Sequence, residues 1–502
     1  MTGNTADEGA PASWAAMDGP RDADDADAAA PARRRLPGLH VLFPLVALLF
    51  VGAFVGTVPA GFGLDEANHT LRAWQVSRGV PEPETITPGL QYGGPVPAAL
   101  VDYVLEGTDA SNAGRGTGQP WTRQDVGLAP DLDELGRAVV SEDSPSVLRD
   151  FTNTGASSFV PYLPAAAGMR VASLLDADVA GVVLAAKAAS GLSYVVLASL
   201  AVLVLRRSRW RWLVALVALL PTTVFQAGVL TADTFSNGIA LLFVASVLAL
   251  HERAGRAPAA LLVGTLTAAL GLVAAKPTYV LLVPLLLLVP TAALGLRNRL
   301  AAWGLRLGAT AVVGVVAVVL TARASDVADA IRTQIVDWPL VDRHVQLAQL
   351  LGDPPRIVGV LARTFVEFGS TWVEGVTAQM GTNSVFLPEP FVVLLIVALV
   401  LAALRGGRPS RVLGWALVLL SLATVCAVVM ALYLTFTVVG APSAVGVQGR
   451  YFTPVLVPLL AGIGMVLPAR VEMGDRTAAV AFSAVSVGSL AVALAVWCVV
   501  VY

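Results

Sequence analysis

The stretch VLFPLVALLFVGAFVGTVPAGFGLDEANH, residues 41–69, joins a long apolar run to an acidic pair. Residues 41–58 contain no charged side chain, and as a helix they are long enough to cross about 30 Å of hydrocarbon. Asp65 and Glu66 follow close to the point where such a helix would leave the bilayer. The stretch therefore predicts a membrane-spanning helix that is followed at once by a polar site.

The composition of the whole chain is that of a membrane protein. Of the 502 residues, 56% are hydrophobic, and the mean hydropathy of +0.73 exceeds that of ordinary soluble domains. The net charge of -2 provides no basic surface for nucleic acid, so the expected partner is the lipid bilayer and no nucleic acid. Cys426 and Cys498, the two cysteines, both lie in apolar runs, which excludes a disulfide framework and a cysteine-based metal cluster.

The first 37 residues differ from the rest. They are rich in Ala, Asp, Gly and Pro and lack periodic apolar positions, which predicts a disordered cytoplasmic tail. The apolar run after it is long for a signal peptide and begins too far into the chain, so we expect it to be retained as the first span. Residues 38–502 then form one polytopic membrane domain. Lysine occurs only at positions 187 and 276, a skew towards arginine that indicates a high-GC bacterial source and hence a bacterial plasma membrane.

Apolar stretches recur to the C-terminus and predict an all-α, polytopic fold of about eleven transmembrane helices. The positive-inside rule places the arginine-rich connections and the N-terminus in the cytoplasm. Two large loops, about 59–177 and 323–390, then lie outside. Residues 159–175 are expected to form a helix at the outer interface, because counting them as a span would turn the next arginine clusters outward. The expected spans are 41–58, 179–205, 213–230, 235–250, 259–275, 279–296, 307–322, 391–404, 412–439, 452–467 and 478–501.

This topology gathers charged residues at the outer face. Residues 64–77 are expected to form a short helix along the membrane surface that begins with the acidic pair. LTADTFSNG places Asp233 at an outer turn, AAKPTYV places Lys276 at the tip of a hairpin, and VQGRYFTP places Arg450 and Tyr451 at the mouth of a span. Ionisable groups at a membrane boundary are costly, so a cluster of them predicts a functional site.

Carboxylates and cations at one face suit sugar transfer from a polyprenyl phosphate. The reaction needs a carboxylate that accepts the proton of the acceptor hydroxyl, and positive charge that stabilises the departing phosphate. Asp65 or Glu66 can serve as the base. Lys276 and Arg450 can bind the phosphate, because arginine holds two oxygens in a fork and lysine acts as a point charge.

Each of these residues also has a purely structural interpretation. Asp65 and Glu66 can cap the short helix. Arg450 with Tyr451 can anchor a span at the interface, and Lys276 can extend its amine from a span end to water.

Three further residues leave alternatives open. His69 shares a helical face with Asp65 and makes either a structural or a substrate hydrogen bond, because no second histidine lies near enough in sequence for a zinc motif. Asp233 either forms a turn or helps to bind a metal ion. Lys187, inside a predicted span, either pairs with an acid or marks an error in the span boundaries.

The motifs GLDEANH, TADTFSNG, AKPTYV and QGRYFTP, in this order, resemble a large bacterial family of predicted multispanning membrane proteins. With the interfacial segment FVPYLP, they also resemble the GT-C superfamily of membrane glycosyltransferases, to which that family is related. The resemblance covers about residues 41–467. It implies a GT-C-like fold and Asp65 as catalytic base with Glu66 beside it. In some GT-C relatives acidic residues also hold a divalent cation, a role in which Asp233 could assist. The chain departs from better-known members in having no large soluble C-terminal domain.

The expected function is therefore transfer of a sugar from a polyprenyl-phosphate-linked donor to a cell-envelope glycan, lipid or protein acceptor at the extracytoplasmic face. A lipid-linked glycan polymerase or ligase is a first alternative, because it shares an outer site but uses a lipid diphosphate. A transporter or flippase is a second, although it should carry ionisable residues near mid-membrane and repeated halves.

Overall fold

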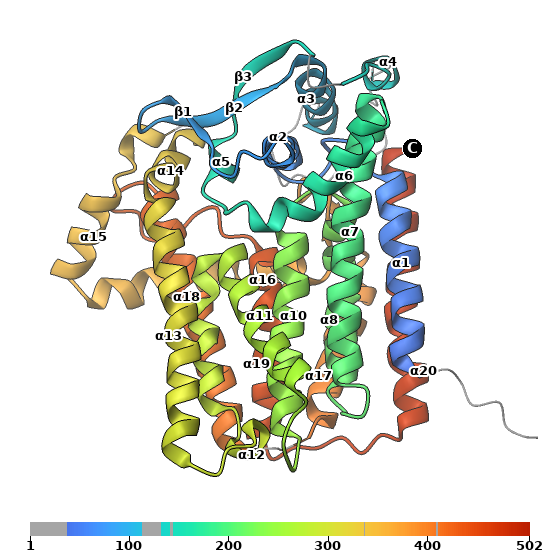
Figure 1. The fold of residues 1–502 in the computed structure, drawn as a ribbon, viewed down its shortest axis with the longest axis vertical. Coiled ribbons are helices and arrows are strands. Elements are labelled where there is room, and N and C mark those ends of the chain that lie inside the picture. Colours follow the sequence, from blue (N-terminus) through green and yellow to red (C-terminus); the bar gives the residue numbers. More distant parts are fainter. Residues whose placement is uncertain (1–37, 113–131, 141–143, 336, 408–409) are drawn as a thin grey trace, which may run out of the picture. The chain divides into compact units, whose positions relative to one another are not determined.

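The computed structural model describes residues 38–112, 132–140, 144–335, 337–407 and 410–502, and this part of the chain is mostly helical (Figure 1). The tail that we expect to be disordered, residues 1–37, lies outside the described residues. Seven described helices are long and apolar enough to cross a membrane. They are α1 (Leu39–Thr57), α7 (Val179–Val204), α10 (Ala232–His251), α13 (Arg299–Arg323), α18 (Arg411–Phe436), the continuous segment Gly449–Val466 made of the 3-10 helix η5 (Gly449–Phe452) and α19 (Thr453–Val466), and α20 (Asp475–Val501).

The prediction of about eleven spans is wrong: the described residues contain seven candidates, or eight if one bent pair is a single span. That pair, α8 (Arg211–Ala218) and α9 (Pro221–Gly228), bends by 56°. Three other predicted spans correspond to the shorter elements α11 (Ala259–Ala275), η2 (Pro277–Leu288) and α17 (Glu389–Arg405). Apolar composition does not show where a helix breaks; prolines, which lack the backbone N–H, open α9 and η2 and shorten the regular segments.

The two ends of the helical bundle differ. Figure 1 shows the elements of the first large loop at one end, and α12 (Thr291–Leu294), the α7–α8 connection and the starts of α1 and α20 at the other. The arginines of residues 206–211 and 297–299 belong to this second end. The first large loop and these two basic connections are therefore at opposite ends of the bundle.

The first loop, between α1 and α7, forms a folded layer. Its strands are arranged in the order β1-β2-β3, all antiparallel, so the protein is mostly helical rather than all-α. The strands were not predicted because they are short and β2, QYGGPVP, lacks a regular alternation of apolar residues. The elements of the layer are α2 (Glu66–Ser77), β1 (Glu84–Thr87), β2 (Gln91–Pro97), α3 (Ala98–Asn112), α4 (Leu132–Gly136), β3 (Ser146–Asp150), α5 (Thr152–Gly155), η1 (Val160–Tyr162) and α6 (Leu163–Leu174).

Helix α2 lies inside this layer. We expected it to lie along the membrane surface with one buried face, but ten of its twelve residues are buried. It packs against α3, α5, α6 and β2. Sequence periodicity could not reveal this enclosure, since the covering elements come from distant parts of the loop.

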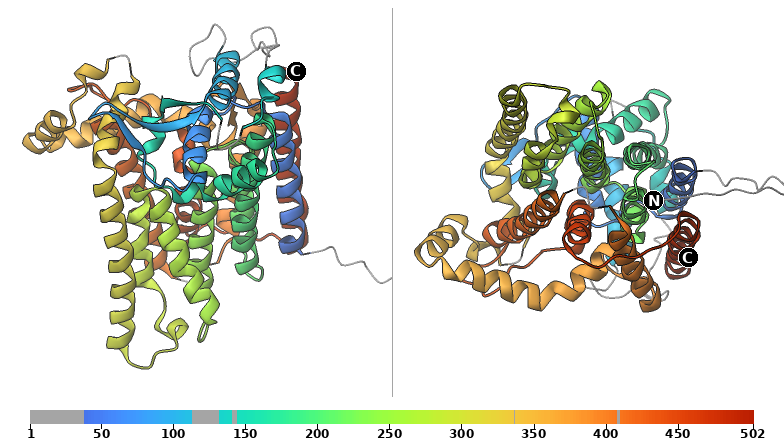
Figure 2. Two further views of the ribbon diagram at one scale, coloured as in Figure 1. Left: turned by 45° about the horizontal axis from the view of Figure 1, so that its top comes forward. Right: turned by 90° about the horizontal axis from the view of Figure 1, so that it is seen from below.

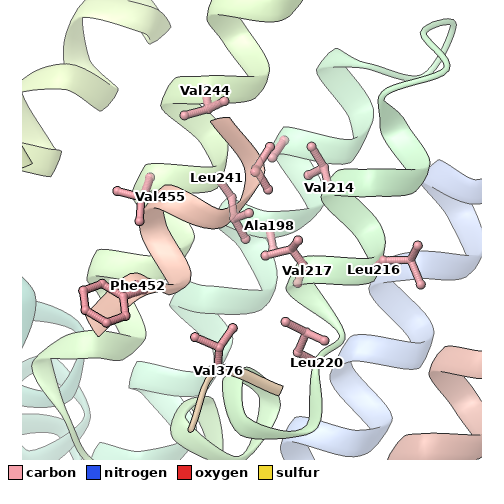
Figure 3. Close-up of a cluster of buried hydrophobic side chains, with 14 of the residues drawn as sticks. Ala198, Val214, Leu216, Val217, Leu220, Leu241, Val244, Val376, Phe452 and Val455 are labelled. Carbon is pink, nitrogen blue, oxygen red and sulfur yellow. The ribbon is translucent and has the colours of Figure 1, made fainter. Parts of the chain in front are cut away.

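The second loop, between α13 and α17, joins the core of the bundle. Figure 3 shows Val376 of this loop near Phe452 of η5, in a cluster with Ala198 of α7, Val217 of α8 and Leu241 of α10. All five side chains are buried. The elements of the loop are α14 (Ser325–Ala330), η3 (Ile331–Gln334), η4 (Trp338–Leu340), α15 (Arg343–Gly352), α16 (Pro355–Thr377), β4 (Gln379–Met380) and β5 (Val385–Phe386).

Helices α18 and α19 touch through glycines, and this contact makes a testable prediction. A Cβ at Gly462 would lie 2.7 Å from the Gly414 carbonyl oxygen, too close for both backbones to stay in place. Gly462→Ala should therefore destabilise the protein by about 1–3 kcal/mol through overpacking. The matched control is Gly314→Ala in α13, where a Cβ would meet no atom within 4 Å. Thermal unfolding of the detergent-solubilised protein measures both; equal midpoints for the two variants would contradict the close contact.

Candidate functional site

Asp65 occupies an unusual backbone position immediately before α2. Its φ of 58° and ψ of 12° are left-handed, a conformation that costs non-glycine residues free energy but that Asp and Asn tolerate best. The side chain does not cap α2. Instead, its carboxylate accepts hydrogen bonds from Asn153 Nδ2 and from Arg450 Nη2, both at 3.3 Å. With 40% of the side chain exposed, this carboxylate is held in place and still accessible.

Glu66 is placed differently, although it is the next residue. It is buried, and its Oε2 accepts the backbone N–H of Gly63 at 2.8 Å while Oε1 accepts that of Leu230 at 3.1 Å. Lys187 Nζ lies 3.8 Å from Oε1 and donates to the Val58 carbonyl oxygen at 2.6 Å. Of the two interpretations of Lys187, the structure therefore shows pairing with an acid. Glu66 connects the turn before α2 to α1, α7 and the α9–α10 connection.

Four charged side chains form an alternating chain beside this turn. Asp65 is bound to Arg450, whose Nε lies 3.6 Å from Asp233 Oδ2, and Asp233 Oδ1 lies 3.9 Å from Lys276 Nζ. They come from four places: the turn before α2, η5, the first turn of α10, and the α11–η2 junction. We call these four residues the charge cluster. The formal charges of its two acids and two cations sum to zero.

The two cations differ in their surroundings. Arg450 is buried, and its Nε makes no hydrogen bond within the described part of the chain. Lys276 is about one-third exposed and lies over the Tyr451 ring, with 4.1 Å between Nζ and the ring centroid. The Tyr451 carbonyl oxygen accepts a hydrogen bond from Tyr279 Oη at 2.9 Å. Tyr451 thus lines the cluster on the side of Lys276.

His69 of α2 contacts η1 and the residue that caps α10. Its Nδ1 is 2.8 Å from Tyr162 Oη, and its Nε2 is 3.4 Å from Thr231 Oγ1. Burial lowers the pKa of His69 to about 4, outweighing the opposite effect of Asp65 and Asp233. The imidazole is therefore neutral at physiological pH, so one ring nitrogen donates a hydrogen bond and the other accepts one. Burial also raises the pKa of Tyr162, so its hydroxyl stays protonated.

The described residues do not fit a divalent cation at Asp233. No group of three or more His, Cys, Asp or Glu side chains able to hold a metal ion occurs among them. The two Asp233 oxygens face Lys276 and Arg450, and cations at those positions repel a metal ion. Asp233 instead balances the charge of both cations.

The sequence interpretation missed residues that position the site. Asn153 binds Asp65 from 88 positions away and lies in α5, a helix of four residues that is too short to give a periodic signal. Tyr162 belongs to the FVPYLP segment, but its contact with His69 could not be read from spacing. Thr231 caps α10 through the backbone N–H of Asp233 at 3.3 Å, a pattern that a threonine at a helix start does predict.

The buried Glu66–Lys187 pair makes a second prediction. Lys187→Met leaves the Glu66 carboxylate buried without its cation, which typically costs about 3–5 kcal/mol. Adding Glu66→Gln removes the uncompensated charge, so the double variant should be more stable than Lys187→Met alone. Thermal unfolding of the parent, both single variants and the double variant measures the coupling. Strictly additive losses would contradict the pairing.

Most of the chain matches the model of one known protein family. A family model described as Predicted membrane protein (DUF2142) matches residues 48–460, a region that contains the whole charge cluster. No curated protein and no solved structure matches the chain. The resemblance to a family of predicted membrane proteins is confirmed, and the GT-C relationship stays a prediction. Because the match covers most of the 502 residues, the chain belongs to the DUF2142 family of predicted membrane proteins.

Proposed function

We propose that this multi-pass membrane protein is a glycosyltransferase of the GT-C type. It moves a sugar from a polyprenyl-phosphate-linked donor to an acceptor of the bacterial cell envelope, at the extracytoplasmic face. The observation that carries the proposal is the accessible Asp65 carboxylate, bound to Arg450 in a charge cluster that also contains Lys276, where helices long and apolar enough to cross a membrane end. A carboxylate and neighbouring cations are the two kinds of group that the reaction requires.

The proposed reaction uses Asp65 as the general base. Asp65 accepts the proton of the acceptor hydroxyl, whose oxygen forms a bond to the anomeric carbon of the sugar. The bond between that carbon and the phosphate oxygen breaks, and the electron pair leaves with the polyprenyl phosphate. Glu66 takes no part in proton transfer here, because its carboxylate is buried and accepts two backbone N–H groups at 2.8 and 3.1 Å, whereas the Asp65 side chain is 40% exposed.

The donor phosphate is proposed to bind at Lys276 and Arg450. Lys276 has only a loose ion pair and reaches solvent, and Arg450 retains an Nε that lacks a hydrogen bond within the described residues. Lys276 can therefore bind an incoming anion without first losing a short contact, whereas the Arg450 Nε is buried and already faces Asp233 at 3.6 Å. The positions of the cluster at the ends of α10 and α11 and in η5 support this site over a transport path through the middle of the membrane.

Replacement of Asp65 by Asn tests the base. Asn tolerates the left-handed backbone and keeps a hydrogen-bonding side chain, but it cannot accept the proton. Loss of a general base costs about 100-fold to 10,000-fold in rate. We expect Asp65→Asn to be expressed and to unfold like the parent, yet to release polyprenyl phosphate far more slowly from the donor lipid extracted from a deletion strain.

Asp102→Asn is the matched control, because Asp102 is an exposed acid in α3 of the same loop. It should leave the rate unchanged. Parental turnover by Asp65→Asn would remove Asp65 as the base. The products also separate the alternatives, since a polymerase or ligase releases polyprenyl diphosphate, and a flippase moves the donor without cleaving it.

The proposed orientation can be tested by thiol labelling. In a chain with Cys426 and Cys498 replaced by Ala, single cysteines at Thr85 and Ser146 mark exposed positions of the first loop, and one at Gly255 marks the opposite end. A membrane-impermeant thiol reagent should label the first two in intact spheroplasts and should label Gly255→Cys only after lysis. Labelling of Gly255→Cys alone before lysis would place the charge cluster in the cytoplasm.

A further inference from the structure

Helix α16 differs in direction from the spanning helices. Figure 2 (right) views most of the spanning helices end-on, whereas the orange helix of the second loop runs across the view. Over its 23 residues, α16 carries three kinds of surface, each on its own face. One face packs on the bundle, a second is apolar and exposed, and a third is charged and exposed.

The packed face holds the segment that leads to Arg450. Trp372 Nε1 donates to the Val447 carbonyl oxygen at 3.1 Å, and Thr364 Oγ1 accepts the backbone N–H of Ala444 at 2.9 Å. Gly375 touches Gly449 so closely that a Cβ on either residue would lie 3.0 Å or less from backbone atoms of the other. Because Gly449 precedes Arg450, α16 supports the backbone that carries this cation.

The exposed apolar face has no cover within the described residues. Val358, Val366 and Val373 repeat at helical spacing on one side, and their exposed fractions are 68%, 88% and 46%. The charged face lies next to it and contains Arg363, Glu367 and Glu374, all exposed. A helix with an apolar face beside a charged face is typical of one that lies in the plane of a membrane interface.

The helices next to α16 indicate whether its exposed apolar face contacts lipid or water. The helix packs against α17 and α18, and both expose apolar side chains outward, among them Val393 of α17 and Leu422 of α18. Because α18 is long and apolar enough to cross a membrane, α16 packs against a helix whose exposed apolar side chains can face lipid. An open groove of about 380 Å³ between α16 and Pro442–Ser443 is lined by both Val366 and Arg363, where the two exposed faces meet.

We propose that α16 is an interfacial helix whose Val358–Val366–Val373 face is embedded in the acyl chains of the bilayer, with Arg363, Glu367 and Glu374 in the headgroup and water layer. The bilayer is the occupant of this face. The depth of α16 in the bilayer then determines the depth of residues 444–449, which it contacts and which lead to Arg450. The proposal rests on membrane association and does not depend on the proposed reaction.

Quenching of a fluorescent label tests the position of α16. In the variant with Cys426 and Cys498 replaced by Ala, Val366→Cys is labelled with a small fluorophore, reconstituted in nanodiscs, and exposed either to brominated-chain lipids or to aqueous iodide. Glu367→Cys is the matched control, because it is the next residue and is also exposed. We expect lipid quenching to be several-fold stronger at residue 366 than at residue 367, and iodide quenching to show the reverse order.

Two outcomes would overturn the proposal. Equal quenching of both labels by iodide would show that the apolar face lies in water. Protection of residue 366 from both quenchers, together with disulfide cross-linking between Val366→Cys chains, would show that a second copy covers the face. Both variants replace exposed side chains, and their unfolding midpoints should match that of the parent.

Discussion

The described site depends on the ion pairs that the buried Arg450 guanidinium makes with Asp65 and Asp233. Moving a charge out of water costs several kcal/mol unless opposite charges compensate it. Asp65 and Asp233 supply this compensation, one from the first loop and one from α10. The three residues join segments up to 385 positions apart, so the first loop is bound electrostatically to the end of the bundle. Loss of the buried Asp233 carboxylate would leave Arg450 undercompensated, whereas an Asn in place of the partly exposed Asp65 keeps a side-chain oxygen that can accept the Arg450 hydrogen bond.

The turn that presents Asp65 is stabilised from outside itself. A left-handed aspartate stores local strain, and the neighbouring Glu66 offsets it by binding the backbone N–H of Gly63 and of Leu230. Lys187 neutralises Glu66 from within α7. Two adjacent acids therefore have different environments: Glu66 is buried and accepts backbone N–H groups at 2.8 and 3.1 Å, and Asp65 is partly exposed and accepts two longer side-chain hydrogen bonds of 3.3 Å. The sequence alone does not distinguish the two adjacent acids, so it makes both of them candidates for the base.

The parts of the site that sequence predicted are those that mark the ends of apolar segments. Asp233, Lys276 and Arg450 each lie at the end of such a segment, so the predicted topology places them on the same side of the membrane as Asp65. Which of them touch is determined by how the helices pack. Asn153 carries no such mark. The span count failed for a related reason, because hydropathy measures composition and is insensitive to the bend after α8 and to the 3-10 geometry of η2.

The charge cluster also suggests how proton transfer and phosphate departure are coupled in the proposed reaction. Before reaction, the two acids and two cations balance, and Arg450 is engaged by Asp65. When Asp65 accepts the acceptor's proton, it becomes neutral and its attraction for Arg450 weakens. The cluster then carries an excess positive charge at the moment when the leaving phosphate gains negative charge. Because Asp65 and Arg450 are in direct contact, protonation of the proposed base would change how strongly this cation stabilises the proposed leaving group.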